Sequence, residues 1–157
     1  MNNLVSIKNV SKSYGKKQVF KDFSLDLPAG RIIGMLGENG IGKTTLLKMI
    51  THIVKPDQGQ IKIMGQEVSR HTKDLVSFLI EPVQLEHMKV SDSIKFHQNF
   101  YSDFCRTKAE ELCNAFSIET KGRIASLSKG EQERICLVLC LSRRVPLYLL
   151  DEPIAAF

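Results

Sequence analysis

Apolar and polar residues alternate with a period of two in several short stretches of the chain, which is the pattern of half-buried β-strands. Short continuous apolar runs, typical of strands buried on both faces, also occur. The strands predicted in this way centre on Val5 and Ile7, on residues 23–27, on residues 31–36, on Ile61 and Ile63, on residues 76–80 and on residues 145–150. Turn residues separate them, for example Pro28-Ala29-Gly30.

Between these strands the apolar residues recur every three or four positions, which predicts helices. Residues 44–54 have this spacing, and Pro56 ends the helix. Residues 91–116 are also helical in pattern, and another helix begins near Ser128. Because strands and helices alternate along the chain, we expect an α/β fold.

The composition indicates a folded, water-soluble protein, with 43% hydrophobic and 25% charged residues among 157. This length suits one domain with its own core. No apolar run reaches the roughly 18 to 20 residues that span a bilayer, and the amino terminus has no secretory signal pattern. We therefore expect a cytoplasmic protein.

The net charge of +5 does not change this picture, because the 22 basic residues are scattered and aromatic residues are not interleaved with them. A mildly basic, solvated surface is favoured over a nucleic-acid groove, so no nucleic-acid partner is expected.

The cysteines are Cys105, Cys113, Cys136 and Cys140. None forms a C-x-x-C pair, and no histidine stands at zinc spacing from them. Cys136 and Cys140 lie one turn apart in an apolar helical stretch, where small thiols pack well. Reduced structural thiols are favoured, with a disulfide or a metal role as the alternative.

A glycine-rich stretch between the predicted strand at 31–36 and the helix after it fits the phosphate-loop pattern G-x-x-x-x-G-K-[ST]. Its residues are Gly37, Glu38, Asn39, Gly40, Ile41, Gly42, Lys43 and Thr44. Glycines let backbone N–H groups converge on phosphate oxygens at a helix N-terminus. Lys43 would face the β- and γ-phosphates, and the Thr44 hydroxyl would bind Mg²⁺. Thr45 offers a further hydroxyl to phosphate, and the alternative is an ordinary glycine turn.

Asp151 and Glu152 follow the last predicted strand, at the edge where α/β sheets bind ligands. Asp151 at this position can hold Mg²⁺ through water, and Glu152 can polarise the attacking water. By itself the pair also fits a strand that ends in an exposed turn, and the phosphate loop makes the catalytic interpretation the stronger one.

With both motifs in place, the chain resembles the nucleotide-binding domain of an ABC transporter over all 157 residues. Residues 127–131, Leu-Ser-Lys-Gly-Glu, resemble the L-S-G-G-Q signature of that family. The resemblance implies that Ser128, Gly130 and Glu131 face the γ-phosphate bound by a second subunit. The same residues also predict a capping box, with Ser128 as the N-cap and Glu131 three residues later.

Two further residues are implied by the resemblance. Tyr14 matches the aromatic residue that stacks on adenine, with a structural turn tyrosine as the alternative. Glu81 stands where the family usually has glutamine, and its carboxylate would contact Mg²⁺ or the lytic water; Gln84 is the rival. A glutamate here resembles the bacitracin- and lantibiotic-type ABC ATPases.

The resemblance also implies the architecture: a P-loop NTPase (RecA-like) core, an amino-terminal antiparallel β-subdomain, and a helical subdomain at roughly 82–142. In the family, the aspartate of the D-loop and the switch histidine follow the Asp-Glu pair, and neither is in this sequence. We therefore expect a domain truncated after the strand that ends at Asp151, either a fragment or the product of a truncated gene.

The function implied is an ATPase subunit that uses ATP and Mg²⁺ to drive a transmembrane permease subunit at the inner face of the membrane. It would pair with a second ABC ATPase subunit, identical or not, and export a peptide, antibiotic or drug. The alternatives are a nucleotide-binding remnant without hydrolysis and a soluble ABC ATPase that acts on the ribosome or DNA.

Overall fold

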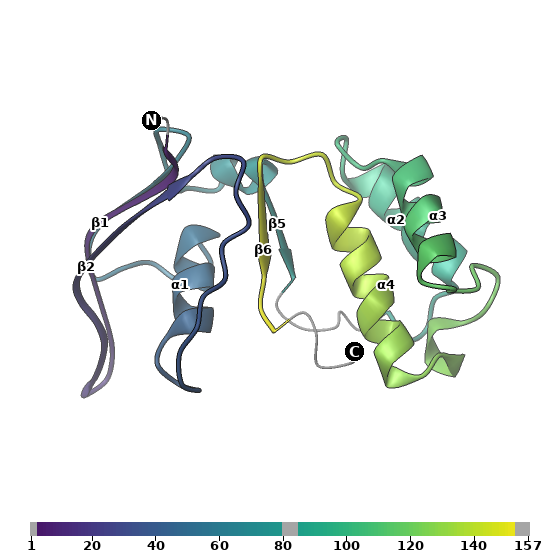
Figure 1. Ribbon diagram of the computed structural model, residues 1–157, viewed down its shortest axis with the longest axis horizontal. Coiled ribbons are helices and arrows are strands. Elements are labelled where there is room, and N and C mark those ends of the chain that lie inside the picture. The colour runs from purple at the N-terminus through teal and green to yellow at the C-terminus, as the bar shows by residue number, and fades with distance from the viewer. Residues whose placement is uncertain (1–2, 80–84, 153–157) are drawn as a thin grey trace. The chain divides into compact units, whose positions relative to one another are not determined.

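The computed structural model describes residues 3–79 and 85–152. The chain divides into two compact units, Met1–Val76 and Ser77–Phe157, each of which has its own set of strands and helices. Figure 1 shows the elements of both units, and each unit is described by itself below.

The first unit is built on an antiparallel sheet of four strands in the order β2-β1-β3-β4. Its strands are β1 (Asn3–Tyr14), β2 (Lys17–Pro28), β3 (Gln58–Ile63) and β4 (Gln66–Glu67), and it also contains the helix α1 (Lys43–Ile50) and a 3-10 turn, η1 (His71–Leu75). In the β1–β3 ladder Val5 pairs with Ile63 and Ile7 with Ile61. The amino-terminal antiparallel sheet predicted from the sequence is thus confirmed.

The core of this unit follows from the alternation along β1. Val5, Ile7 and Val10 are almost completely buried, and so are Ile61 and Ile63 on β3. The helix α1 packs against β3, and its apolar residues Leu46, Leu47, Met49 and Ile50 are buried. Burial of each of these side chains stabilises the unit by about 1.5 to 3 kcal/mol.

The predicted strand at 31–36 is wrong. Residues 31–38 have no regular secondary structure, and Ile32 and Leu36 are 105% and 97% exposed. A strand needs a hydrogen-bonded neighbour, and none of the described strands pairs with this segment. The apolar composition of this segment is typical of a buried strand, but composition contains no information about which strand would pair with it.

The first helix is shorter than predicted, since α1 ends at Ile50 and not at residue 54. The Thr51 hydroxyl donates to the carbonyls of Leu47 and Lys48 at 3.1 Å. His52 then adopts a left-handed backbone, with φ of 57°. A left-handed residue cannot continue an α-helix, so the helix stops one turn early.

The described residues of the second unit form two strands and three helices. These are β5 (Val76–Leu79), α2 (Val90–Phe100), α3 (Arg106–Ala115), the 3-10 turn η2 (Ile124–Ser126), α4 (Lys129–Leu141) and β6 (Leu147–Leu150). The strands β5 and β6 form a two-stranded sheet and run in the same direction. The helices enclose an apolar cluster that includes Val90, Ile94, Ala109, Cys113, Ile135 and Val138.

The stretch predicted as helical from Ser91 to Phe116 forms two helices, with a break between α2 and α3. Within the break Phe104 is buried in the apolar cluster. Asp103 pairs with an arginine 40 positions further along the chain. These contacts pull the connecting residues out of helical geometry, and a local spacing pattern contains no information about them.

That arginine is Arg143, which follows α4 and is 7% exposed. Its Nε and Nη2 atoms donate to the two carboxylate oxygens of Asp103, at 2.9 and 2.7 Å. Its guanidinium also lies 4.1 Å from the centre of the Tyr101 ring. Two parallel charge-assisted hydrogen bonds and a ring contact make this a well-satisfied pair of a buried arginine and a half-buried aspartate.

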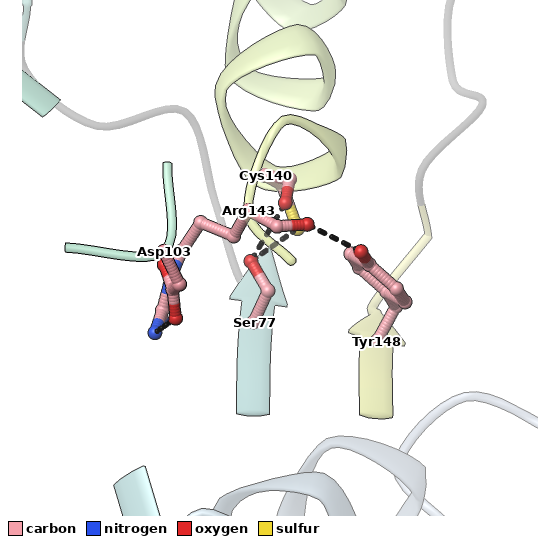
Figure 2. Close-up of polar contacts among 5 residues, drawn as sticks. All are labelled: Ser77, Asp103, Cys140, Arg143 and Tyr148. Carbon is pink, nitrogen blue, oxygen red and sulfur yellow. Dashed lines mark hydrogen bonds and ion pairs between the residues drawn. The ribbon is translucent and has the colours of Figure 1, made fainter. Parts of the chain in front are cut away.

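The strands are tied to the same end of α4, as Figure 2 shows. The Ser77 hydroxyl on β5 donates to the Cys140 carbonyl at 2.8 Å, and the Tyr148 hydroxyl on β6 donates to the Arg143 carbonyl. The carboxyl end of α4, the α2–α3 connection and both strands therefore meet around one buried polar cluster.

We predict that Arg143→Met destabilises the protein by about 3 kcal/mol, because it leaves the Asp103 carboxylate without its charged partner. The matched control is Arg106→Met, which removes the exposed i,i+4 pair with Glu110 and should cost at most about 0.5 kcal/mol. Urea unfolding followed by circular dichroism measures both. Equal losses in the two variants would contradict a stabilising role for the Arg143–Asp103 pair.

Candidate functional site

The phosphate loop lies in the first unit, directly before α1. Gly42 is the residue that precedes the helix and has φ of 117°. A Cβ atom at Gly42 would lie 2.5 Å from Val19 Cγ1 and 3.0 Å from Phe20 Cζ. Glycine is therefore required here both by the backbone conformation and by the close approach of β2.

The loop curls around its own lysine. Lys43 Nζ donates to the carbonyl oxygens of Gly37 and Glu38, at 2.6 and 3.0 Å. The Ile41 N–H donates to the same Glu38 carbonyl at 3.3 Å. The ammonium thus occupies the inside of a tight backbone turn at the start of a helix, where the helix dipole also favours an anion.

The remaining loop residues surround this turn. Gly37, Glu38, Asn39, Gly40 and Ile41 are exposed, whereas Gly42, Lys43, Thr44 and Thr45 are half-buried. Thr44 and Thr45 belong to the first turn of α1. The segment is accessible from solvent and has no side-chain hydrogen bond to cap the helix, as a phosphate-binding loop requires.

Tyr14 ends β1 at the tip of the β1–β2 hairpin, and it is 48% exposed. It pairs in register with Lys17, the first residue of β2. Lys17 Nζ in turn donates to the Gly40 carbonyl at 3.4 Å. The hairpin tip and the phosphate loop are therefore in contact, which places an exposed aromatic ring on a hairpin that reaches the loop.

Sequence reasoning missed the residues of β2 that hold the loop, namely Lys17, Val19 and Phe20. Their positions show no motif. The sequence indicated only that these residues follow the turn after Tyr14. A local pattern does not show that this segment contacts a loop some 20 residues later.

The two acidic residues lie in the second unit, at the end of β6. The Asp151 N–H donates to the Leu79 carbonyl at 2.9 Å, so the carboxyl ends of β5 and β6 lie side by side. Glu152 is exposed and has a left-handed φ of 45°. Such a conformation is uncommon for glutamate and is often found at functional sites. Glu81 and Gln84 lie outside the described residues.

The predicted capping box is confirmed. Ser128 is the N-cap of α4, and its hydroxyl accepts the Glu131 N–H at 3.4 Å. The Glu131 carboxylate accepts the Ser128 hydroxyl at 2.6 Å and the Ser128 N–H at 2.8 Å. The hydrogen bond from the Ser128 hydroxyl, followed by that from its N–H, lowers the pKa of Glu131 below its ordinary value of 4.5. Gly130 is half-buried, in the first turn of this helix.

The structure thus defines two partial sites. The phosphate loop, Lys43, Thr44, Thr45 and the Tyr14 hairpin share the first unit. Asp151, Glu152 and the α4 N-terminus with Ser128, Gly130 and Glu131 belong to the second unit. Within the described residues Cys105, Cys113, Cys136 and Cys140 form no disulfide bond, and the last three are buried. Within residues 3–79 and 85–152, no helix is long and apolar enough to cross a membrane.

A glycine loop that closes on a lysine at the start of a helix, joined to an antiparallel sheet, defines a P-loop nucleotide-binding protein. The profile of the ABC transporter family matches residues 20–155, and the chain belongs to this family. Its fold class, an α/β P-loop NTPase with an antiparallel sheet and helices, is that of ABC ATPase domains.

Known relatives agree with this assignment. The chain is 35% identical to the ABC transporter ATP-binding protein YtrB of Bacillus subtilis, over 96% of this chain and 52% of YtrB. It is 34% identical to the sulfate/thiosulfate import ATP-binding protein CysA of Escherichia coli, over 97% of this chain and 45% of CysA. A putative ABC transporter ATP-binding protein of Pyrococcus furiosus superimposes with a TM-score of 0.86 at 28% identity, covering 98% of this chain and 77% of that chain. The chain spans about half the length of the curated relatives it matches.

We predict that Ser128→Ala lowers the melting midpoint by about 3 °C at pH 7, because it removes both hydroxyl hydrogen bonds of the capping box. The difference from wild type should shrink as the pH falls. Because the pKa of Glu131 is lowered in the folded state, its stabilisation is complete above its unfolded pKa and is lost as the pH falls through the folded value. Melts from pH 7 to pH 3 measure this.

The control for this experiment is Ser126→Ala, two residues before the cap, where the hydroxyl donates to the Arg123 carbonyl and no carboxylate takes part. Its effect on the melting midpoint should not depend on pH over the same range. A Ser128→Ala difference that stayed constant down to pH 3 would contradict a role for the ionised Glu131.

Proposed function

We propose that the chain is the ATP-binding part of an ABC transporter, in which ATP binding and hydrolysis drive a transmembrane permease subunit. The observation that carries this proposal is the loop at 37–44. Its backbone encloses the Lys43 ammonium at the start of a helix, beside an exposed Tyr14 hairpin. The membership in the ABC transporter family supports the same function.

Nucleotide binding would use residues of the first unit. The Lys43 ammonium would exchange its two carbonyl partners for oxygens of the β- and γ-phosphates, which are stronger acceptors. The N–H groups of residues 37–44 and the α1 dipole would complete the phosphate site. Tyr14 would stack on the adenine ring, and Thr45 would add a hydroxyl to phosphate.

Hydrolysis would use the carboxylates of the second unit. Glu152 would accept a proton from the attacking water, a role that suits an exposed carboxylate at the end of a strand. Mg²⁺ prefers hard oxygen ligands and usually keeps several waters, and the Thr44 hydroxyl and the Asp151 carboxylate are donors of this kind. When bound, the ion would neutralise phosphate charge. Glu81 is a further proposed ligand to Mg²⁺ or to the lytic water.

A second ABC ATPase subunit, identical or different, would complete the site. Ser128, Gly130 and Glu131 at the start of α4 would face the γ-phosphate held by that partner, because a helix N-terminus attracts anions. The Glu131 carboxylate already bonds Ser128, so its charge is partly compensated within the capping box.

For the transported substrate we propose export of a peptide, antibiotic or drug, with the subunit held at the inner membrane face by its permease. This proposal rests on Glu81, by which the sequence resembles the peptide-antibiotic ABC ATPases. The name of one relative, CysA, denotes sulfate/thiosulfate import. Resistance to bacitracin-like peptides on expression with the cognate permease would support export, and sulfate-dependent growth would support import.

We predict that Lys43→Ala weakens ATP binding by about 2 kcal/mol, or roughly 30-fold in Kd, because a charge facing two phosphates is lost. Isothermal titration calorimetry with ATP and Mg²⁺ measures this. Lys48→Ala is the control, because Lys48 lies on the same helix outside the loop. This variant should bind ATP with the affinity of the wild-type protein. Equal affinities of the Lys43 variant and wild type would refute the proposed phosphate site.

We further predict that Glu152→Gln keeps ATP affinity but slows hydrolysis about 100-fold, the effect expected for loss of a general base. Phosphate release by the full-length gene product, assembled with its partner subunit, is the measurement. Glu119→Gln, at an exposed position between α3 and α4, serves as the control. Near-normal turnover in the Glu152 variant would assign the role to another carboxylate.

A further inference from the structure

The exposed ring of Tyr14 has a cation on one face. Lys12 Nζ lies over the ring, 5.5 Å from its centre. The two residues are separated by one position on β1, so their side chains leave the strand on the same side. The Lys12 side chain is 14% exposed although its charge lies near the surface. A lysine held this closely does not behave as a freely solvated surface charge.

Asp57 holds this lysine in place. Its Oδ1 atom accepts a hydrogen bond from Lys12 Nζ at 2.8 Å, and its Oδ2 atom accepts the Ser13 N–H at 2.7 Å. Its own N–H donates to the Ser11 carbonyl at 2.9 Å. The side chain of Asp57 thus extends the β1–β3 ladder, which ends at the pair Ser11 and Gln58.

These three contacts fix Asp57 from the side chain and from the backbone. The hydrogen bond from Lys12, and then that from the Ser13 N–H, lowers the pKa of Asp57, so the carboxylate is ionised at neutral pH. The contacts span 45 positions of sequence and connect the turn after α1 to the strand that carries Tyr14. An ordinary exposed ion pair lacks such backbone anchoring.

We propose that Lys12 and Asp57 are positioning residues for the base of the bound nucleotide: Asp57 anchors Lys12, and Lys12 covers one face of Tyr14, so that the base stacks on the opposite face. This inference rests on the proposed ATP site and adds to it the residues that orient the ring. Neither residue belongs to the phosphate loop or to the acidic pair.

The physical reason is the cost of ordering a ring. An exposed tyrosine samples several orientations, and a base that stacks on it must select one. A cation held against one face by the ring quadrupole restricts the ring and leaves one face for stacking. Lys12 should therefore increase the part of the affinity that comes from the base and leave the phosphate contribution unchanged.

The test compares two ligands, ATP and inorganic tripolyphosphate, each with Mg²⁺. Tripolyphosphate carries the phosphate charge and has no base to stack on Tyr14. The ratio of the two dissociation constants isolates the contribution of the base. It is also insensitive to partial unfolding, because both ligands bind the same folded fraction.

We expect Lys12→Met to reduce the preference for ATP by about threefold, the range of an exposed cation–π contact, with little change for tripolyphosphate. Asp57→Asn should act in the same direction, and Lys12→Arg should retain the preference. In a Tyr14→Ala background, Lys12→Met should have no further effect on the ratio, because the two residues act through one ring. Lys8→Met is the control, since it removes an exposed lysine from the same strand.

Three results would overturn this inference and leave the proposed ATP site standing. They are an unchanged ratio of dissociation constants in Lys12→Met, an equal loss of affinity for both ligands in that variant, or an effect of Lys12→Met on the ratio that is as large in the Tyr14→Ala background. An equal loss would mean that Lys12 acts on the phosphates. If the wild-type chain bound neither ligand, the proposed function would fail, and this inference with it.

Discussion

The candidate nucleotide site depends on the close contact between the phosphate loop and the start of β2. Gly42 has a backbone conformation that glycine tolerates, and it leaves no room for a side chain between the loop and Val19. This contact fixes where α1 begins, because Gly42 precedes its first residue. It also brings the β1–β2 hairpin to the loop, where Lys17 reaches the Gly40 carbonyl. The residues proposed to bind the phosphates and the base are therefore positioned by the same two strands.

The second unit relies on a different kind of constraint. Its strands and the carboxyl end of α4 meet around Arg143, whose charge is satisfied by Asp103 and whose carbonyl accepts the Tyr148 hydroxyl. Apolar side chains of the same volume in place of both residues would stabilise the fold about as well, whereas removal of one partner is costly because the other charge stays unpaired. The pair also permits few alternative arrangements of these elements. Since β6 leads directly to Asp151 and Glu152, the cluster fixes the strand that presents the proposed catalytic carboxylates.

Several features that depend on local sequence were predicted correctly, although the end of α1 was not. Alternation along β1 and β3 identified strands and their buried residues, and Ser128 with Glu131 identified the start of α4. Features that depend on distant partners were not. The run at 31–36 has the composition of a buried strand, yet no described strand pairs with it. The break after Phe100 depends on Asp103 contacting Arg143, and these residues lie far apart in the sequence.

The residues of the candidate site differ in the same way in how far the sequence alone points to them. The glycine-lysine spacing of the loop follows from phosphate chemistry, so Lys43 and Thr44 are recognisable from sequence. Lys12, Lys17 and Asp57 are not, because their positions gain meaning only once β1, β2 and the turn after α1 are brought together. Residues that touch a ligand are constrained by its chemistry and form motifs, whereas residues that position them are constrained by the fold.

Ser128 at the start of α4 belongs to both groups, because it caps the helix and is also proposed to face the γ-phosphate. The Ser128 hydroxyl donates to Glu131 and accepts from its N–H, so its hydrogen-bonding capacity is largely used within the helix cap. For Ser128 to donate to a phosphate, its hydroxyl must turn away from the carboxylate, which would then keep only the Ser128 N–H as a partner. At the proposed γ-phosphate site Glu131 would therefore compete with the phosphate for the same donor. A neutral glutamine at this position would weaken that competition, since hydrogen bonds to a charged acceptor are about twice as strong.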